Sequence, residues 1–143
     1  MSSLVRQRSR LVRVRRIQHD LAACAAAEAV GQVQMLETSR ERLGKMRREL
    51  RPSEGLTSGG SLARISELAM RLDSARQGLV RSLNSARSLA AARESFRLSA
   101  RRDQESAEKL EKAATGAAEL LAERRPLRSG RVRPRLQQDG EEE

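Results

Sequence analysis

The side chains of this chain that could do chemistry are one cysteine, one histidine and a small serine-glycine loop. Cys24 lies in the segment "LAACAAAEA", residues 21–29, whose small residues around a cysteine are typical of a bacterial lipoprotein cleavage site. A secretory signal needs an apolar stretch of about 7–15 residues before that site. The preceding segment "LVRVRRIQHD" contains arginines and an aspartate instead. We therefore interpret Cys24 as a small core residue and not as a lipid or redox site.

The other polar candidates also fit simpler structures. His19 and Asp20 are adjacent, but the chain has no second histidine or cysteine to complete a zinc site. The sequence "SGGS", residues 58–61, lacks the Lys-Ser or Lys-Thr and the preceding strand of a phosphate-binding loop, so it indicates a turn. Nucleophile and nucleotide-binding motifs do not occur. We expect no catalytic, cofactor or metal site, and we do not expect an enzyme.

Arginine is the most serious functional candidate. The net charge is +10, carried almost entirely by arginine, which favours an acidic partner. A nucleic-acid interpretation would assign residues 6–16 and 128–135 to phosphates. Against it, Phe96 is the only aromatic residue available for base stacking, and Val14 and Ile17 place an apolar stripe within the first arginine cluster. This pattern favours a helix face beside a protein partner.

The elements that must position these residues are two long helices. Ala, Leu, Arg and Glu dominate the composition, and aromatic residues make up only 1% of it. Breakers gather in residues 51–61, and Pro126 marks a second break. The sequence predicts an all-α antiparallel two-helix coiled-coil hairpin over residues 1–125. The helices are expected at about 3–50 and 62–125, the second capped by Ser61 with Ser58 as a rival, and a disordered tail at 126–143.

The second helix carries two candidate seam rows with a seven-residue period. The first row is Ile65, Leu72, Leu79, Ala86, Arg93, Ala100, Ala107, Ala114 and Leu121. The companion row is Leu68, Ala75, Ser82, Leu89, Phe96, Asp103, Leu110, Ala117 and Arg124. Apolar residues fill most of both rows, which indicates a coiled coil.

The first helix has a less regular pattern. The 3-4 spacing of a seam is followed first by Val14, Ile17, Leu21 and Cys24, and then, in a shifted phase, by Leu36, Leu43, Met46 and Leu50. Because the shift falls in the alanine-rich segment, we interpret it as a stutter that locally unwinds the supercoil.

The expected hairpin also has an expected register. If Leu50 faces Leu62, the numbers of facing residues sum to about 112. Cys24 would then lie near residues 88–89, and "LAACAAAEA" would face "SLAAAR", so that small residues meet small residues and the helices approach closely. Gly31 and Gly78 would also lie roughly opposite one another.

A family resemblance adds a function to this architecture. The segment "SARRDQESAEKLEKA", residues 99–113, is similar to the Ala/Arg-rich run and Lys-Leu-Glu-Lys end of the FliJ family of type III export stalk proteins. Residues 109–112 match that end, whereas Ala113 replaces the family's leucine. The resemblance implies a coiled-coil hairpin that inserts into the export ATPase hexamer, contacts the export gate and escorts chaperones.

From the resemblance we expect a cytoplasmic protein, peripheral to the inner membrane and not embedded in it. The residues expected to bind the ATPase ring are Arg13, Arg16, Lys109 and Lys112, which the predicted hairpin brings near its open end. The alternatives are a structural coiled-coil adaptor and an arginine-rich nucleic-acid-binding protein.

Overall fold

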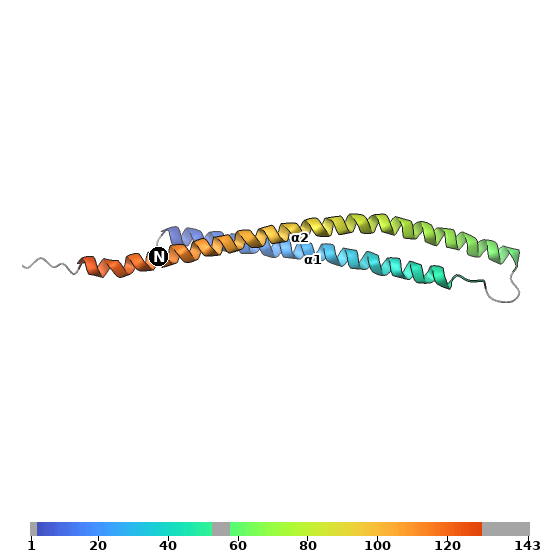
Figure 1. Cartoon of the computed structure of the whole chain (residues 1–143), viewed down its shortest axis with the longest axis horizontal. Coiled ribbons are helices and arrows are strands. Elements are labelled where there is room, and N and C mark those ends of the chain that lie inside the picture. The colour runs from blue at the N-terminus through green and yellow to red at the C-terminus, as the bar shows by residue number, and fades with distance from the viewer. Residues whose placement is uncertain (1–2, 53–57, 130–143) are drawn as a thin grey trace, which may run out of the picture. The chain divides into compact units, whose positions relative to one another are not determined.

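The computed structural model describes residues 3–52 and 58–129, which form two α-helices. α1 comprises Ser3–Glu49 and α2 comprises Gly59–Ser129 (Figure 1). The described residues contain no β-strand, and neither described helix has an apolar stretch long enough to cross a membrane. The predicted all-α fold is therefore confirmed. Most of the predicted tail, from residue 130 onward, lies outside the described residues.

The start and end of α2 differ slightly from the prediction. Ser58 is the N-cap, since its Oγ accepts a hydrogen bond of 3.2 Å from the backbone N–H of Ser61. The alternative cap, Ser58, is thus correct in place of Ser61, and α2 begins at Gly59 and not at about residue 62. α2 also continues through Pro126 to Ser129, so Pro126 does not end the helix as expected.

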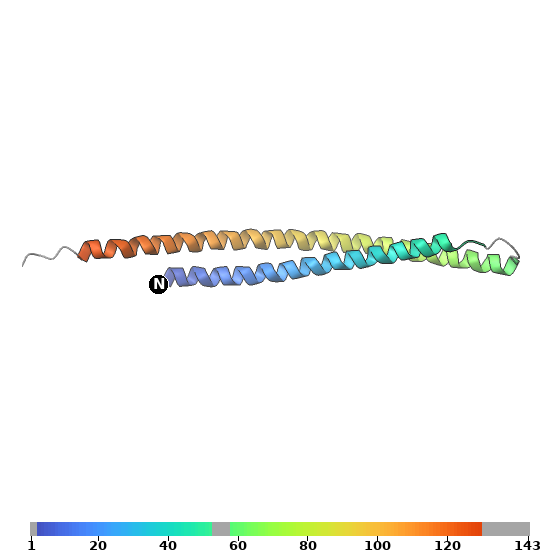
Figure 2. The same ribbon diagram turned by 90° about the horizontal axis from the view of Figure 1, so that it is seen from below.

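The chain divides into two compact units, and segments of α1 and α2 run antiparallel in each (Figures 1 and 2). The terminal unit contains the described residues 3–15 of α1 and 103–129 of α2. The hairpin unit contains the described residues between 16 and 102. The predicted antiparallel hairpin is thereby confirmed.

Side-chain pairs between the helices establish the register. In the terminal unit these pairs are Ser9 with Glu111 and Arg15 with Asp103, and in the hairpin unit they are Arg47 with Asp73 and Glu37 with Arg87. The residue numbers of the pairs sum to 120, 118, 120 and 124. The predicted sum of about 112 is wrong by roughly two helical turns.

The error in the register has a simple physical source. The prediction placed the first residues of the second helix beside the last residues of the first. Residues 59–64 are instead all exposed, because the first turns of α2 do not pack against α1. "LAACAAAEA" is therefore level with residues 91–99, which include only the last three residues of "SLAAAR", and Gly31 and Gly78 are not opposite one another.

In the hairpin unit, one of the two predicted rows of α2 faces α1. Residues 65, 72, 79 and 86 are half-buried and residue 100 is buried, as expected, although Arg93 is exposed. The companion row is wrong, since Leu68, Leu89 and Phe96 are 49%, 51% and 63% exposed. The second inward row lies one residue later and consists of Ala69, Arg76, Leu83, Ala90 and Arg97. Leu83 is only 1% exposed.

The terminal unit repeats the same arrangement. Ala107 of the first predicted row is buried together with Gln104, which belongs to the later row. In the companion row, Leu110 is 46% exposed, and Asp103, Ala117 and Arg124 are also exposed. Leu121, at the end of the first row, is exposed as well. On α1, Val5 and Val12 are buried, whereas Val14, which was expected inside, is 50% exposed.

The seam of α1 in the hairpin unit is regular and has no stutter. Ala22, Ala29, Leu36 and Leu43 follow one another every seven residues, Leu50 continues the series just after the end of α1, and all are buried or half-buried. Ile17, Leu21, Cys24 and Met46 were expected inside but are exposed. The apparent phase shift arose because the first set of apolar residues belongs to another face of the helix.

The choice of faces follows from the sizes of the side chains. Ala22, Ala26 and Ala29 provide a narrow surface on α1, and small side chains let helix backbones approach closely. If the row that contains the larger leucine and phenylalanine side chains faced α1, the two helix backbones would lie further apart. We call the contact between the inward rows the seam. In the alanine-rich part of α1, the seam therefore buries small residues, and larger side chains such as Leu89 and Phe96 stay outside.

Candidate functional site

The four residues expected to bind a partner are all exposed, but they lie in different units. Arg13, Lys109 and Lys112 belong to the terminal unit, and Arg16 belongs to the hairpin unit. In the terminal unit, α2 also carries acidic residues, and the side chain of Arg15 forms a 3.2 Å ion pair with Asp103. Part of the positive charge of α1 is thereby balanced within the molecule. Whether the four residues bind a partner stays a prediction.

The hairpin unit has two edges of different chemistry, one on each side of the seam. On α2, the row Asp73, Val80, Arg87 and Glu94 flanks the inward row of Leu83, and the row Leu68, Ala75, Ser82, Leu89 and Phe96 flanks the inward row of Leu72. With 3.6 residues per turn, the two flanking rows lie on opposite sides of the seam. We call the first row the charged edge and the second row the apolar edge.

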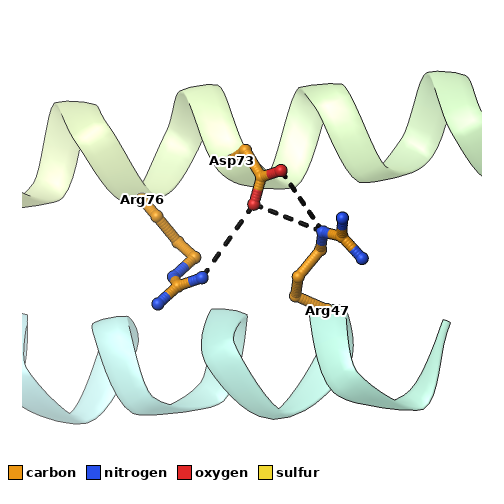
Figure 3. A network of polar contacts seen from close by, with 3 residues as sticks. All are labelled: Arg47, Asp73 and Arg76. Carbon is orange, nitrogen blue, oxygen red and sulfur yellow. Dashed lines mark hydrogen bonds and ion pairs between the residues drawn. The ribbon is translucent and has the colours of Figure 1, made fainter.

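The charged edge joins the two helices through ion pairs. Arg47 Nε of α1 donates to both carboxylate oxygens of Asp73 at 3.3 Å, and Arg76 lies 3.9 Å from the same carboxylate (Figure 3). Arg87 of α2 donates a 2.8 Å hydrogen bond to Glu37 of α1. Exposed pairs of this kind contribute little stability, so their main effect here is on register and on the local surface charge.

A basic groove of about 710 Å³ lies on the side of the charged edge. Its basic lining residues are Arg40, Arg42, Lys45, Arg48, Arg76 and Arg87. Among the described residues, Arg40, Arg42 and Arg48 form no ion pair or hydrogen bond. Their guanidinium groups are thus available for carboxylates or phosphates, which guanidinium binds in a planar, bidentate manner.

The alanine-rich segment of the opening motif borders a second, shallower groove of about 370 Å³. Ala23, Ala26 and Ala27 line one side, and the ion pair of Glu94 and Arg97 lines the other. Two hydrogen bonds of 2.8 and 2.7 Å join this pair. They lower the pKa of Glu94 and raise that of Arg97, and the mutual attraction of the charges acts in the same direction.

The residues first considered for chemistry occupy ordinary structural positions. Cys24 is exposed on α1, which corrects its interpretation as a core residue. The side chain of His19 is 16% exposed and lies 3.6 Å from Asp20, but its Nε2 is buried without a hydrogen-bond partner. Within residues 3–52 and 58–129, no three His, Cys, Asp or Glu side chains are placed to hold a metal ion.

Comparisons with protein-family models, with curated proteins and with solved structures found no match to this chain.

Sequence reasoning missed both edges and the basic groove. The signal for the apolar edge was present, because the companion row was recognised as apolar and periodic. It was assigned to the inside because apolar residues fill most of its positions at a seven-residue period. The groove could have been found by counting charges, since the described part of the hairpin unit holds 16 arginines and lysines against 8 aspartates and glutamates.

Proposed function

We propose that this chain is a non-enzymatic coiled-coil component of a flagellar or type III protein export apparatus. In this proposal it acts in the cytoplasm, at the inner face of the membrane, as the stalk of the export ATPase hexamer, and it contacts the export gate and chaperones. Support comes from the resemblance of residues 99–113 and from the antiparallel two-helix fold that the resemblance implies.

The observation that carries a protein-binding role is the exposure of large apolar side chains on a basic hairpin. Ile17 and Leu21 of α1 are 55% and 66% exposed. On α2, Leu89 and Phe96 are 51% and 63% exposed. A two-helix surface offers no enclosed pocket for desolvating a small substrate. Exposed apolar rows beside arginines suit a protein partner with an acidic surface.

The experiment measures ATP hydrolysis by the export ATPase of the same organism with and without this protein. We expect stimulation by the wild-type protein and its loss in the charge reversals Arg13→Glu/Arg16→Glu and Lys109→Glu/Lys112→Glu. Arg51→Glu/Arg64→Glu is the matched control, because both side chains are exposed and unpaired among the described residues. Full stimulation by the charge-reversed proteins would contradict the assigned residues.

Co-purification with the ATPase that leaves ATP hydrolysis unchanged would favour a structural coiled-coil adaptor. Absence of both binding and stimulation would contradict the export proposal.

Nucleic-acid binding is the second candidate, and the basic groove is the observation that favours it. Three unpaired arginines in one groove could neutralise phosphates, and such binding weakens steeply with salt. The test is fluorescence anisotropy of labelled duplex DNA at physiological salt, with Arg40→Glu/Arg42→Glu/Arg48→Glu as the variant. Tight binding that this variant abolishes would establish the second candidate, whereas binding only at low salt would count against it.

A further inference from the structure

We propose that Leu89 and Phe96 of the apolar edge of the hairpin unit, together with the adjacent Arg93, dock an acidic amphipathic helix of a protein partner. The inference rests on the proposed protein-binding role and names a surface and a partner chemistry for it. None of the ring-binding residues named above belongs to this surface.

The three side chains form a short ridge along one side of α2. Leu89 and Phe96 are seven residues apart and therefore lie two turns apart on the same face, with Arg93 next to both at spacings of four and three. Leu89 is 51% exposed, Phe96 is 63% exposed and Arg93 is also exposed. Recognition of an amphipathic helix uses anchors at this spacing.

The neighbouring positions leave room for a partner helix along the ridge. Towards the start of α2, the apolar edge continues with the small residues Ser82 and Ala75, both exposed. Across the seam, the same register places Ala25 of α1, which is half-buried, within one residue of the level of Phe96. Small residues flank the ridge on both sides, so a third helix can approach it closely.

Charge selects an acidic partner over a second copy of this chain. Arg93 forms no ion pair or hydrogen bond with any described residue, and neither does Arg81, which lies about two turns before Leu89. The described residues of the hairpin unit include 16 basic and 8 acidic side chains. Two such units would repel one another, whereas glutamates flanking a leucine row would pair with the free guanidinium groups.

The chemistry of the ridge also favours a helix over a nucleic acid. Phosphates would be attracted to Arg93, but they gain nothing from leucine beside it. Aromatic and arginine side chains are the residues that most often dominate protein interfaces. Phe96 is the single aromatic residue of the chain and lies beside an unpaired arginine on this ridge.

The experiment uses the full-length protein and three synthetic fluorescent peptides. The probe is an amphipathic helix with leucines at heptad spacing and glutamates elsewhere. A scrambled peptide has the same composition without the leucine stripe, and a third peptide has lysine in place of glutamate. Binding is measured by fluorescence anisotropy at physiological salt, and circular dichroism at 222 nm checks that each protein variant is folded.

We expect the wild-type protein to bind the glutamate probe and to bind the scrambled peptide at least about tenfold more weakly. Leu89→Ser/Phe96→Ser and Arg93→Glu should each weaken probe binding by about tenfold or more. Met70→Ser is the matched control: Met70 is 66% exposed on the same helix but outside the apolar edge, and the variant should bind like wild type. Arg93→Glu should gain affinity for the lysine peptide.

Three results would overturn the proposal. These are equal binding of probe and scrambled peptide, unchanged binding by Leu89→Ser/Phe96→Ser, and a wild-type dimer in sedimentation velocity that this variant dissociates. The last result would assign the edge to a second copy. None of these measurements involves the export ATPase, so failure here is distinguishable from failure of the proposed function.

Discussion

Leu83 and Leu89 are the same residue type on the same helix, six positions apart, but they differ in what surrounds them. Leu83 is 1% exposed and Leu89 is 51% exposed. Leu83→Ala should lower the free energy of unfolding by about 2–4 kcal/mol because it removes the most deeply buried large side chain of the seam. Leu89→Ala should change it by less than about 0.5 kcal/mol. Urea unfolding followed at 222 nm measures both free-energy changes. Equal effects of the two substitutions would contradict the assignment of the row of Leu83 to the seam.

Gln104 is a polar residue in the seam of the terminal unit. It is 7% exposed, and its Nε2 donates a 2.9 Å hydrogen bond to Glu108 while its Oε1 is buried without a partner. Gln104→Leu should raise the free energy of unfolding by about 1 kcal/mol, because the unpaired oxygen is removed. Gln77→Leu, at an exposed position of α2, is the control and should have little effect. A destabilised Gln104→Leu protein would mean that the glutamine is required for packing.

Glu94 should contribute to the pH dependence of stability. The hydrogen bond from Arg97, aided by the charge of the guanidinium, lowers the pKa of Glu94. Because the pKa of Glu94 is lowered in the folded state, its ionised carboxylate stabilises the protein at pH values above the ordinary glutamate pKa of about 4.3. This contribution is lost as the pH falls through the lowered pKa. An NMR titration of the Glu94 carboxyl should give a midpoint that rises towards the ordinary value in Arg97→Gln. An unchanged midpoint would show that the pair does not persist in solution.

At the scale of the elements, the register of α1 against α2 is the feature that a cross-link can test. Glu37→Cys/Arg87→Cys, in a Cys24→Ser background, replaces two side chains whose ends are 2.8 Å apart. A short bismaleimide should join them rapidly within one chain. Glu37→Cys/Ala75→Cys is the comparison, because a register sum of 112 would bring these two positions together. Faster reaction of the second pair, read as the mobility shift on a denaturing gel, would contradict the structure.

The two helices and their antiparallel pairing were predictable because composition and breakers act locally. The turn residues between 51 and 61 and the helix-forming residues on both sides are sufficient for that prediction. The register was not predictable, since it depends on where α2 first packs against α1. That contact is made only after the exposed residues 59–64, less than two turns, which no local signal marks.

The seam of α2 shows why the faces were harder to predict than the helices. A seven-residue period identifies rows but does not say which of two adjacent rows faces inward. The apolar residues at most positions of the companion row selected the row of Leu89 and Phe96, whereas the alanines of α1 fit the row of Leu83 and Ala90. Of the candidate site, only the individual side chains could be named from the sequence. Both edges depend on the seam and on the register.

At the scale of the whole molecule, the full sequence has a net charge of +10. Among the described residues, the charge is distributed unequally between the two units. In the terminal unit, the arginines of α1 lie beside an acid-containing stretch of α2, as the pair of Arg15 and Asp103 shows. The hairpin unit has twice as many basic as acidic side chains among its described residues. A partner attracted by net charge is therefore expected to favour the hairpin unit.

The alanine seam has a consequence for the heat of unfolding. The heat-capacity increment of an ordinary domain, about 12–15 cal/mol/K per residue, comes mainly from apolar surface that water reaches on unfolding. Alanines expose little such surface, and many larger apolar residues are already in contact with water in the folded chain. We therefore expect calorimetry to give an increment well below that range. The stability curve should be shallow, with a broad melting transition and little loss of stability on cooling.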